Sequence, residues 1–240
     1  MGKSLVQQAR GRGGPTYRSP SFNFAGKVEY PVIKQEQLVG KVVDIIHCQG
    51  HTAPLVSVLY ENRETGLMIA PEGIRIGDSV MMGGEPELGN ALMLKDIPEG
   101  SLIFNIESVP GDGGKFVRAS GTFAKILSKS SNFILVMLPS KKEKQFLPAC
   151  RATIGIVAGG GRVEKPFMKA GIKYYKMKQK NKYWPRTSGT SQNSVDHPFG
   201  GKRSSRKGRP TVAPRDAPPG RNVGKMHPRK TGRGKLKVER

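Results

Sequence analysis

Between residues 31 and 160, short apolar runs alternate with turn-forming segments. Each run holds four to eight residues rich in Val, Ile, Leu and Phe and is bounded by Gly, Pro, Asn, Asp or Ser, which predicts β-strands. The runs lie at residues 41–48, 55–61, 66–70, 91–97, 101–108, 122–128, 132–139 and 152–157. Their spacing leaves no room for crossover helices, so we predict antiparallel strands in two small barrels, with a seam near residues 89–94.

Beyond residue 160 this pattern ends. Residues 166–180 predict a short helix with Pro166 in its first turn, although Gly171 weakens the pattern. From Pro185 onward Gly, Pro, Ser, Lys and Arg dominate, and residues 1–26 are similarly basic and turn-forming. Such segments bury too little apolar surface to offset the entropy of ordering, so we expect extended arms that a partner orders.

The net charge of +23 is unevenly distributed. Residues 1–30 carry +4 and residues 31–160 carry 0, while residues 161–240 carry +19 from 23 basic and four acidic residues. This charge indicates a polyanionic partner, either nucleic acid or an anionic membrane surface. No run approaches the roughly 20 apolar residues that span a bilayer, and the N-terminus lacks the apolar core of a secretory signal. Two cysteines, Cys48 and Cys150, favour a reducing cytosol over a disulfide scaffold.

Residues 173–184, KYYKMKQKNKYW, interleave lysines with aromatic residues. Lysines neutralise phosphates and aromatic faces stack on bases, so the segment favours contact with nucleic acid. The alternative is a helix that packs its aromatic side chains on the barrels. The glycines at 159–161, followed by Arg162, allow close approach to a phosphate, or form a flexible exit from the last strand.

Two further clusters suggest chemistry. An imidazole beside a carboxylate at Asp196–His197 suits proton transfer in principle, but its sequence neighbours predict no packed shell to hold it. We therefore predict a loop that RNA supports, and no enzyme. The alternatives are an enzyme that acts on RNA through this pair with a metal, and a soluble regulator that binds nucleic acid reversibly. His47, Cys48 and His51 are too few for a zinc site, so a loop after a strand is favoured.

Several motifs resemble the universal large-subunit ribosomal protein two family, in its archaeal and eukaryotic branch. They are SVDHPFGGKRSSRKGRP, RDAPPGRNVGKMHPRKTGRGK, WPRTSG, KPFMKAG, CRATIGIVAGGGR, APLVSVLYENRETGLMIAPEGIRIGD and GDGGKFVRASGTFAKI. The likeness covers essentially the whole chain. The sequence departs from the family pattern at Asn193–Ser194, at residues 188–191 and in the loop at residues 47–51.

The resemblance implies a mainly β fold with long basic arms. It divides the chain into an extended N-terminal arm (1–30), an oligonucleotide-binding-type barrel (31–90), an SH3-like barrel (91–162) and a basic C-terminal extension threaded into RNA (163–240). It also implies a structural, non-enzymatic protein of the cytoplasmic large ribosomal subunit, near the peptidyl-transferase centre, that supports subunit association and tRNA placement.

The implied partners are 23S-type rRNA, neighbouring large-subunit proteins and, through an intersubunit bridge, the small subunit, with no membrane. No cofactor is expected beyond Mg²⁺ or K⁺ held jointly with rRNA. Asp196 and His197 are expected only to shape the loop nearest the peptidyl-transferase centre. The residues expected to contact RNA are Arg10, Arg12, Arg18, Arg162, Lys165, Lys173, Tyr174, Lys176, Lys182, Trp184, Arg186, His197, Lys202, Arg203, Arg206, Lys207, Arg209, Arg215 and Arg221.

Overall fold

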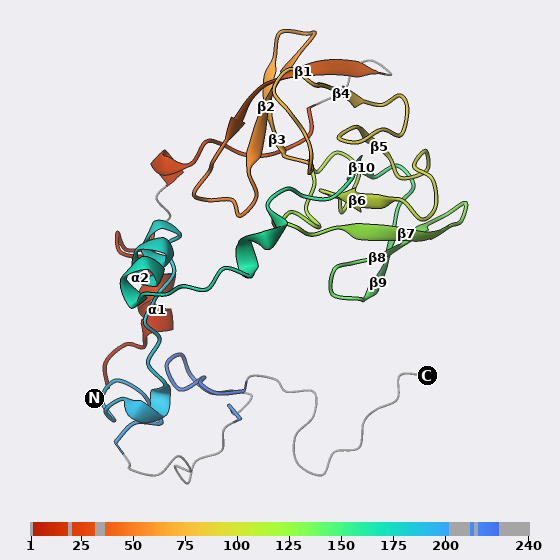
Figure 1. Ribbon diagram of the computed structural model, residues 1–240. Helices are drawn as coiled ribbons and strands as arrows, with labels where there is room; N and C mark the ends of the chain where they lie inside the picture. The colour runs from red at the N-terminus through yellow and green to blue at the C-terminus, as the bar shows by residue number, and fades with distance from the viewer. Residues whose placement is uncertain (1, 19–20, 32–36, 202–211, 214–215, 226–240) are drawn as a thin grey trace. The chain divides into compact units, whose positions relative to one another are not determined.

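The computed structural model describes residues 2–18, 21–31, 37–201, 212–213 and 216–225. The chain divides into two compact units. One, called the β unit below, is Ser21–Lys169, and the other, called the basic unit, combines Met1–Pro20 with Ala170–Arg240. Figure 1 colours the chain from its N-terminus to its C-terminus and labels the elements of both units.

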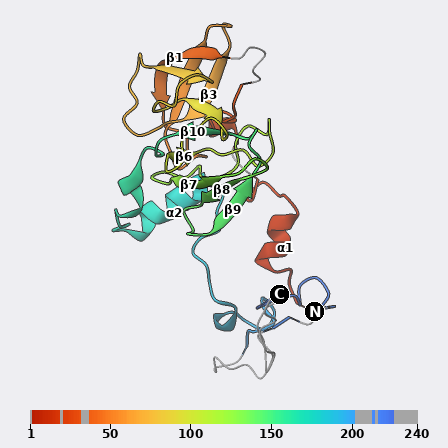
Figure 2. The same ribbon diagram turned by 90° about the vertical axis from the view of Figure 1, so that its right-hand side faces the viewer.

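The described residues of the β unit contain ten strands in one continuous hydrogen-bonded order, β3-β2-β1-β4-β5-β10-β6-β7-β8-β9. All neighbouring pairs are antiparallel except β4 and β5, which meet in parallel through the single pair Met82 and Ala91. The strands are β1 (Leu38–Ile46), β2 (Leu55–Tyr60), β3 (Thr65–Ile69), β4 (Ser79–Met82), β5 (Ala91–Met93), β6 (Leu102–Phe104), β7 (Ala124–Lys129), β8 (Ile134–Met137), β9 (Glu143–Phe146) and β10 (Arg151–Ile154). In Figure 2, as in Figure 1, β1 and β3 group apart from β6 to β9.

Each half of the sheet packs on its own hydrophobic cluster. The first cluster is formed by residues of β1 to β4 together with Tyr30, Ala70 and Ala91. The second is formed by residues between Leu92 and Ala152, around Ile103, Ile126 and Val136. A third cluster, which includes Leu55 of β2 and Phe104 of β6, joins the two halves. The fold is therefore mainly β, as predicted, and the first two clusters are consistent with two small barrels. The four-part division at residues 30, 90 and 162 stays a prediction, since the contacts group residues 21–169 together.

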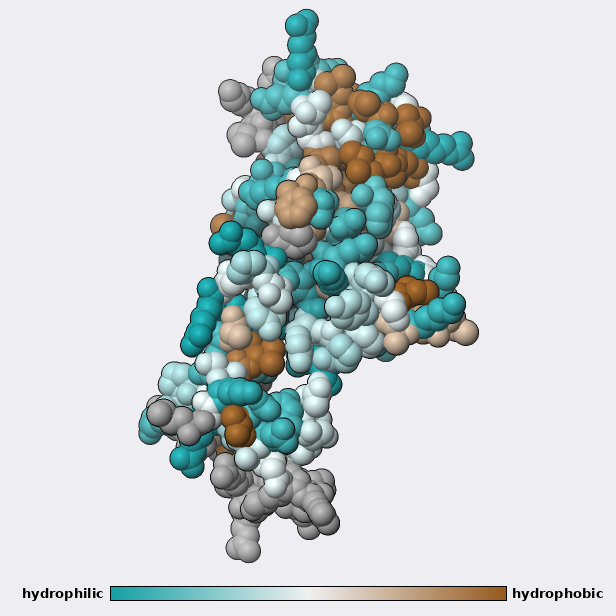
Figure 3. Space-filling model, turned by 90° about the vertical axis from the view of Figure 1, so that its left-hand side faces the viewer, coloured by the Kyte–Doolittle hydropathy of each residue, from teal (hydrophilic) through white to brown (hydrophobic). Residues whose placement is uncertain are grey.

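A β-bulge bends each half of the sheet at a corresponding place. The register shifts between Val42 and Asp44 on β1, and between Ile126 and Ser128 on β7. One extra residue in a strand increases twist and helps a short sheet to curl around its core. The extra residues, Val43 and Leu127, are exposed. Figure 3 shows other apolar side chains on the surface as well.

The predicted strand segments match the structure in position but not always in length. Residues 101–108 form a strand only as far as Phe104, because Asn105 takes a left-handed φ of 50°. The hydrophobic pattern does not predict β4 or β9, each of which has only four residues. In β9 only Phe146 is buried, and the strand lies at one end of the sheet order, where charged residues such as Lys144 are common.

A buried ion pair links the second cluster to the segment before β1. Glu107 is fully buried and accepts bonds from the Arg151 guanidinium at 2.8 and 3.1 Å. Arg151 also donates to the carbonyl of Pro31 at 2.9 Å, and the hydroxyl of Tyr30 donates to the carbonyl of Asn105 at 2.8 Å. Burial raises the pKa of Tyr30, so its hydroxyl stays protonated. The network satisfies polar groups that would otherwise destabilise the core.

The basic unit holds α1 (Val6–Gly11) and α2 (Ala170–Gln179). α1 was not predicted, because only six residues are helical and none is buried. α2 begins at Ala170, four residues after Pro166, and ends at Gln179, close to the predicted end. No residue of α2 is buried, which fits a segment without an apolar stripe.

Candidate RNA-binding surface

The residues predicted to contact RNA fall in both units. Arg162 and Lys165 belong to the β unit, and all the others belong to the basic unit. Lys202, Arg203, Arg206, Lys207, Arg209 and Arg215 lie outside the described residues. The four acidic residues after position 160 can neutralise only a few of the 23 cations there, so most of this positive charge needs a partner other than the segment itself.

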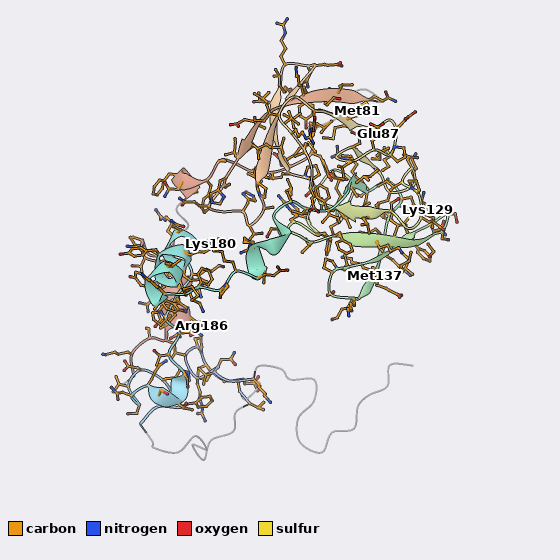
Figure 4. All side chains as sticks on the ribbon, viewed as in Figure 1. Met81, Glu87, Lys129, Met137, Lys180 and Arg186 are labelled. Atoms are coloured by element: carbon orange, nitrogen blue, oxygen red, sulfur yellow. The ribbon has the colours of Figure 1, made fainter. Side chains whose placement is uncertain are left out.

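Cations and aromatic rings lie together on α2 and the segment after it. The Nζ of Lys173 lies 5.5 Å from the centre of the Trp184 ring, and Tyr174 and Tyr175 meet edge to face at 5.6 Å. Tyr174 and Tyr175 are 43% and 65% exposed, which leaves much of each ring available for stacking on a base. Figure 4 labels Lys180 and Arg186 on the same stretch of chain. Lys176, Lys182 and Arg186 add further positive charge there.

The N-terminal segment contributes a second group of cations. Arg10 and Arg18 are exposed, and Arg12 donates to the hydroxyl of Ser4 at 3.3 Å. Leu5 is buried and Gln8 accepts its amide N–H at 3.1 Å, which caps α1. The segment is therefore anchored by its short helix while its guanidinium groups face solvent.

Residues 187–201 form a hydrogen-bonded loop around His197. The amides of Asp196 and His197 both donate to the carbonyl of Asn193, at 3.0 and 3.1 Å, and Gly201 donates to that of Gln192 at 3.1 Å. A β-carbon on Gly200 would clash with the Asn193 carbonyl, so the turn closes only around glycine. Composition alone did not predict this internal order.

The ring of His197 is fixed by its own loop. Its Nδ1 accepts the amide N–H of Phe199 at 3.0 Å, which places the single proton of the neutral imidazole on Nε2. Burial lowers the pKa of His197, so the neutral form dominates at pH 7. The ring therefore presents an N–H donor, because the lone pair that a general base would use is already engaged.

Asp196 does not act on that imidazole. Its carboxylate lies 3.8 Å from the Nζ of Lys3, and burial is what shifts the pKa of His197. The backbone N–H of Lys3 donates to the carbonyl of Val195 at 2.8 Å. The N-terminal segment is thus held against the loop, a pairing across most of the chain that no local sequence pattern predicts.

The glycines at 159–161 make a close contact inside the β unit. A β-carbon on Gly121 would lie less than 3.0 Å from the Cα of Gly160. Arg162 donates from Nε to the hydroxyl of Ser120 at 2.9 Å, and Gly159 has a left-handed φ of 81°. Gly121 therefore has to be glycine where it packs against Gly160, a contact that neither sequence interpretation included. Arg162 and Lys165 remain exposed.

The loop at residues 47–51 shows no metal site. Cys48 is buried, and its sulfur lies 3.2 Å from the Nδ1 of His51. Within the described residues no three His, Cys, Asp or Glu side chains converge as metal ligands would. The residues that the structure describes also include no helix long and apolar enough to cross a membrane.

A compact β-rich unit joined to segments with exposed cations and aromatic rings defines a nucleic-acid-binding protein. Residues 87–222 match the family model described as "Ribosomal Proteins L2, C-terminal domain". The chain is 49% identical over 240 residues to large ribosomal subunit protein uL2 of Methanopyrus kandleri, covering 98% of this chain and 99% of the relative. It is 46% identical over 240 residues to the uL2 protein of Halorubrum lacusprofundi, covering 99% and 100%. The chain therefore belongs to the L2 family of ribosomal proteins, in agreement with the resemblance of its motifs.

Proposed function

We propose that this chain is a structural protein of the large ribosomal subunit and that it binds rRNA. The observation that carries the proposal is the match, over nearly the whole length of both chains, to relatives named large ribosomal subunit protein uL2. The names of these relatives also support a location in cytoplasmic ribosomes.

The basic unit supplies the means of binding. Lysine and arginine side chains replace the counterions of RNA phosphates, and release of those counterions drives association. The exposed rings of Tyr174 and Tyr175 beside Lys173 suit unpaired bases, which are the usual targets of sequence-specific RNA recognition. Residues 31–160, which carry no net charge, supply a scaffold from which the cationic segments extend along the sequence.

Within the subunit, we propose a position near the peptidyl-transferase centre, where the chain supports subunit association and tRNA placement. Neighbouring large-subunit proteins and a bridge to the small subunit are the further partners. Mg²⁺ or K⁺ held jointly with rRNA would reduce repulsion between phosphates close to the cationic segments.

The loop of His197 is proposed to be structural rather than catalytic. Its Nδ1 is occupied by the Phe199 amide, and Asp196 faces Lys3 instead of completing a relay. Such a ring can position RNA by donating from Nε2, but it does not accept a proton without breaking its own loop contact.

Two measurements test the proposal. The endogenous protein should sediment with large subunits through a high-salt wash, and its presence only in the free fraction would contradict the proposal. The affinity of the full chain for a 23S-type rRNA transcript should fall linearly with salt on a log–log plot. With six to ten phosphate contacts the loss between 50 and 200 mM salt is about 10³–10⁵-fold, and a flat response would overturn the rRNA-binding role.

A further inference from the structure

A cavity of about 680 Å³ opens inside the basic unit. Its walls come from three parts of the chain: residues 2–8, residues 194–199, and residues 212–213 with 219–223. The bond from the Lys3 amide to the Val195 carbonyl joins the first two walls. The third wall is closed by the bridge between Val212 and Lys225. The volume falls within the range of about 300–1,000 Å³ typical of small-ligand pockets, so one nucleotide fits inside.

Several polar side chains of the lining are hydrogen-bond donors. Lys3 and Arg221 bring positive charge from opposite ends of the sequence. Gln8 uses its Oε1 to accept the Leu5 amide, which leaves its Nε2 group to donate, and His197 presents Nε2–H. Asp196 is the one carboxylate of the lining. A lining rich in donors fits a ligand rich in acceptors, such as a phosphate joined to a base with ring nitrogens and carbonyl oxygens.

Aromatic rings form part of the same lining. The rings of His197 and Phe199 lie 5.2 Å apart, tilted by 55°. Phe199 is only half-buried, so part of its ring borders the open space. An aromatic ring beside fixed cations is the combination that binds an unstacked base together with its phosphate.

We propose that this cavity binds one unstacked nucleotide of RNA, with its phosphate at Lys3 and Arg221 and its base against Phe199. The inference rests on the proposed function, because it assigns a specific nucleotide-binding site within the rRNA contact. The N-terminal and C-terminal segments build the site together, so neither end of the chain binds the nucleotide alone.

The test compares variants of the full chain bound to a 23S-type rRNA transcript. Ultraviolet cross-linking followed by mass spectrometry should join Phe199 to a single nucleotide, and base-specific chemical probing should show that nucleotide protected. Phe199→Leu keeps the apolar volume and the backbone N–H that His197 accepts, but removes the ring. The variant should weaken binding of the rRNA about tenfold, because the base loses its stacking partner. The salt dependence should not change, because no phosphate contact is lost.

Arg221→Ala and Arg10→Ala form a matched pair, because each removes one exposed arginine from the same unit and only Arg221 lines the cavity. Arg221→Ala should lower the salt slope by about one and expose the protected nucleotide, whereas Arg10→Ala should leave that nucleotide protected. The inference is wrong if the nucleotide is as well protected in Arg221→Ala as in Arg10→Ala. It is also wrong if the nucleotide stays protected in Phe199→Leu.

The outcomes separate this inference from the proposed function. A chain that binds rRNA without a nucleotide whose protection depends on Phe199 refutes the cavity site and leaves the proposed function standing. A chain that does not bind rRNA refutes both. Guanosine and adenosine monophosphates supply the last comparison. If they bind the cavity and rRNA does not displace them, the site takes free nucleotides and the inference is wrong.

Discussion

The imidazole of His197 lies directly against the backbone of Gly189. A β-carbon placed on Gly189 would come within 3.0 Å of three ring atoms of His197, closer than real β-carbons approach other atoms. The ring is also held by the Phe199 amide, which donates to its Nδ1. The two contacts together fix both the position and the tautomer of the side chain.

Gly189→Ala should therefore displace His197. The added methyl group costs about 1–3 kcal/mol of local overpacking, which the loop relieves by moving the ring toward solvent. The pKa of His197 should then rise toward its ordinary value, because burial is what lowers it. Nuclear magnetic resonance of the ring protons measures this pKa directly. Gly171→Ala is the control, because a β-carbon there meets open space, and it should leave the pKa of His197 unchanged.

The loop around His197 should loosen in acid. Because the pKa of His197 is lowered in the folded loop, the unfolded loop binds a proton more readily than the folded one. The stability of the loop therefore rises with pH through this range. The contribution is complete above the ordinary pKa of about 6.5 and is lost as pH falls toward the folded value. Protonation of Nδ1 also breaks the bond from the Phe199 amide.

Hydrogen exchange at the Phe199 amide, corrected for its intrinsic pH dependence, reports this opening. After that correction, the protection of the Phe199 amide should be greater at pH 7.5 than at pH 5.5. His197→Asn is the control, because its side-chain oxygen replaces the Nδ1 acceptor but does not titrate. Equal pH dependence in the two proteins would rule out His197 as the cause.

The pair of Glu107 and Arg151 should be worth far more than a surface ion pair. Glu107 is fully buried and also accepts the amides of Arg151 and Gly113, at 2.9 and 3.2 Å. Glu107→Ala leaves a guanidinium and two amides without their partner, which should cost about 3–5 kcal/mol of unfolding free energy. Lys27→Ala removes the exposed partner of Glu29 and should cost less than about 1 kcal/mol.

Urea denaturation followed by circular dichroism compares the two variants. Glu107→Gln should fall between them, since it keeps the shape and part of the hydrogen bonding while removing the charge. Similar losses from Glu107→Ala and Lys27→Ala would show that the buried pair has no special role in the core.

The β unit was predictable where burial sets the sequence pattern. Strands such as β2 and β8 alternate or accumulate apolar residues because one or both faces lie against a core. The pattern fails where other forces act. β9, which contains Lys144, is held in place by its pairing with β8 and not by its own hydrophobicity. Asn105 ends β6 through its backbone conformation, which no hydrophobic pattern encodes.

The RNA-binding surface was predictable as a composition and not as a geometry. Clustered lysines with Tyr174 and Trp184 indicate a nucleic-acid partner whatever their arrangement. The pairing of Lys3 with Asp196 joins residues nearly 200 positions apart in the sequence, and local patterns carry no information about such contacts. The acceptor role of His197 depends on a turn that begins at Asn193, so the motif alone suggested a catalytic pair that the structure separates.

Gly121→Ala should destabilise the β unit more than a change within the glycine run itself. Gly121 has a left-handed φ of 70°, and its β-carbon would collide with the Cα of Gly160. The conformational penalty is about 1–2 kcal/mol, and the collision adds about 1–3 kcal/mol unless residues 159–161 move. Gly161→Ala places its methyl group in open space and should be nearly neutral. Urea denaturation of both variants tests the order. If the run is only a flexible exit from β10, residues 159–161 will move aside, and Gly121→Ala will cost only its conformational penalty of about 1–2 kcal/mol.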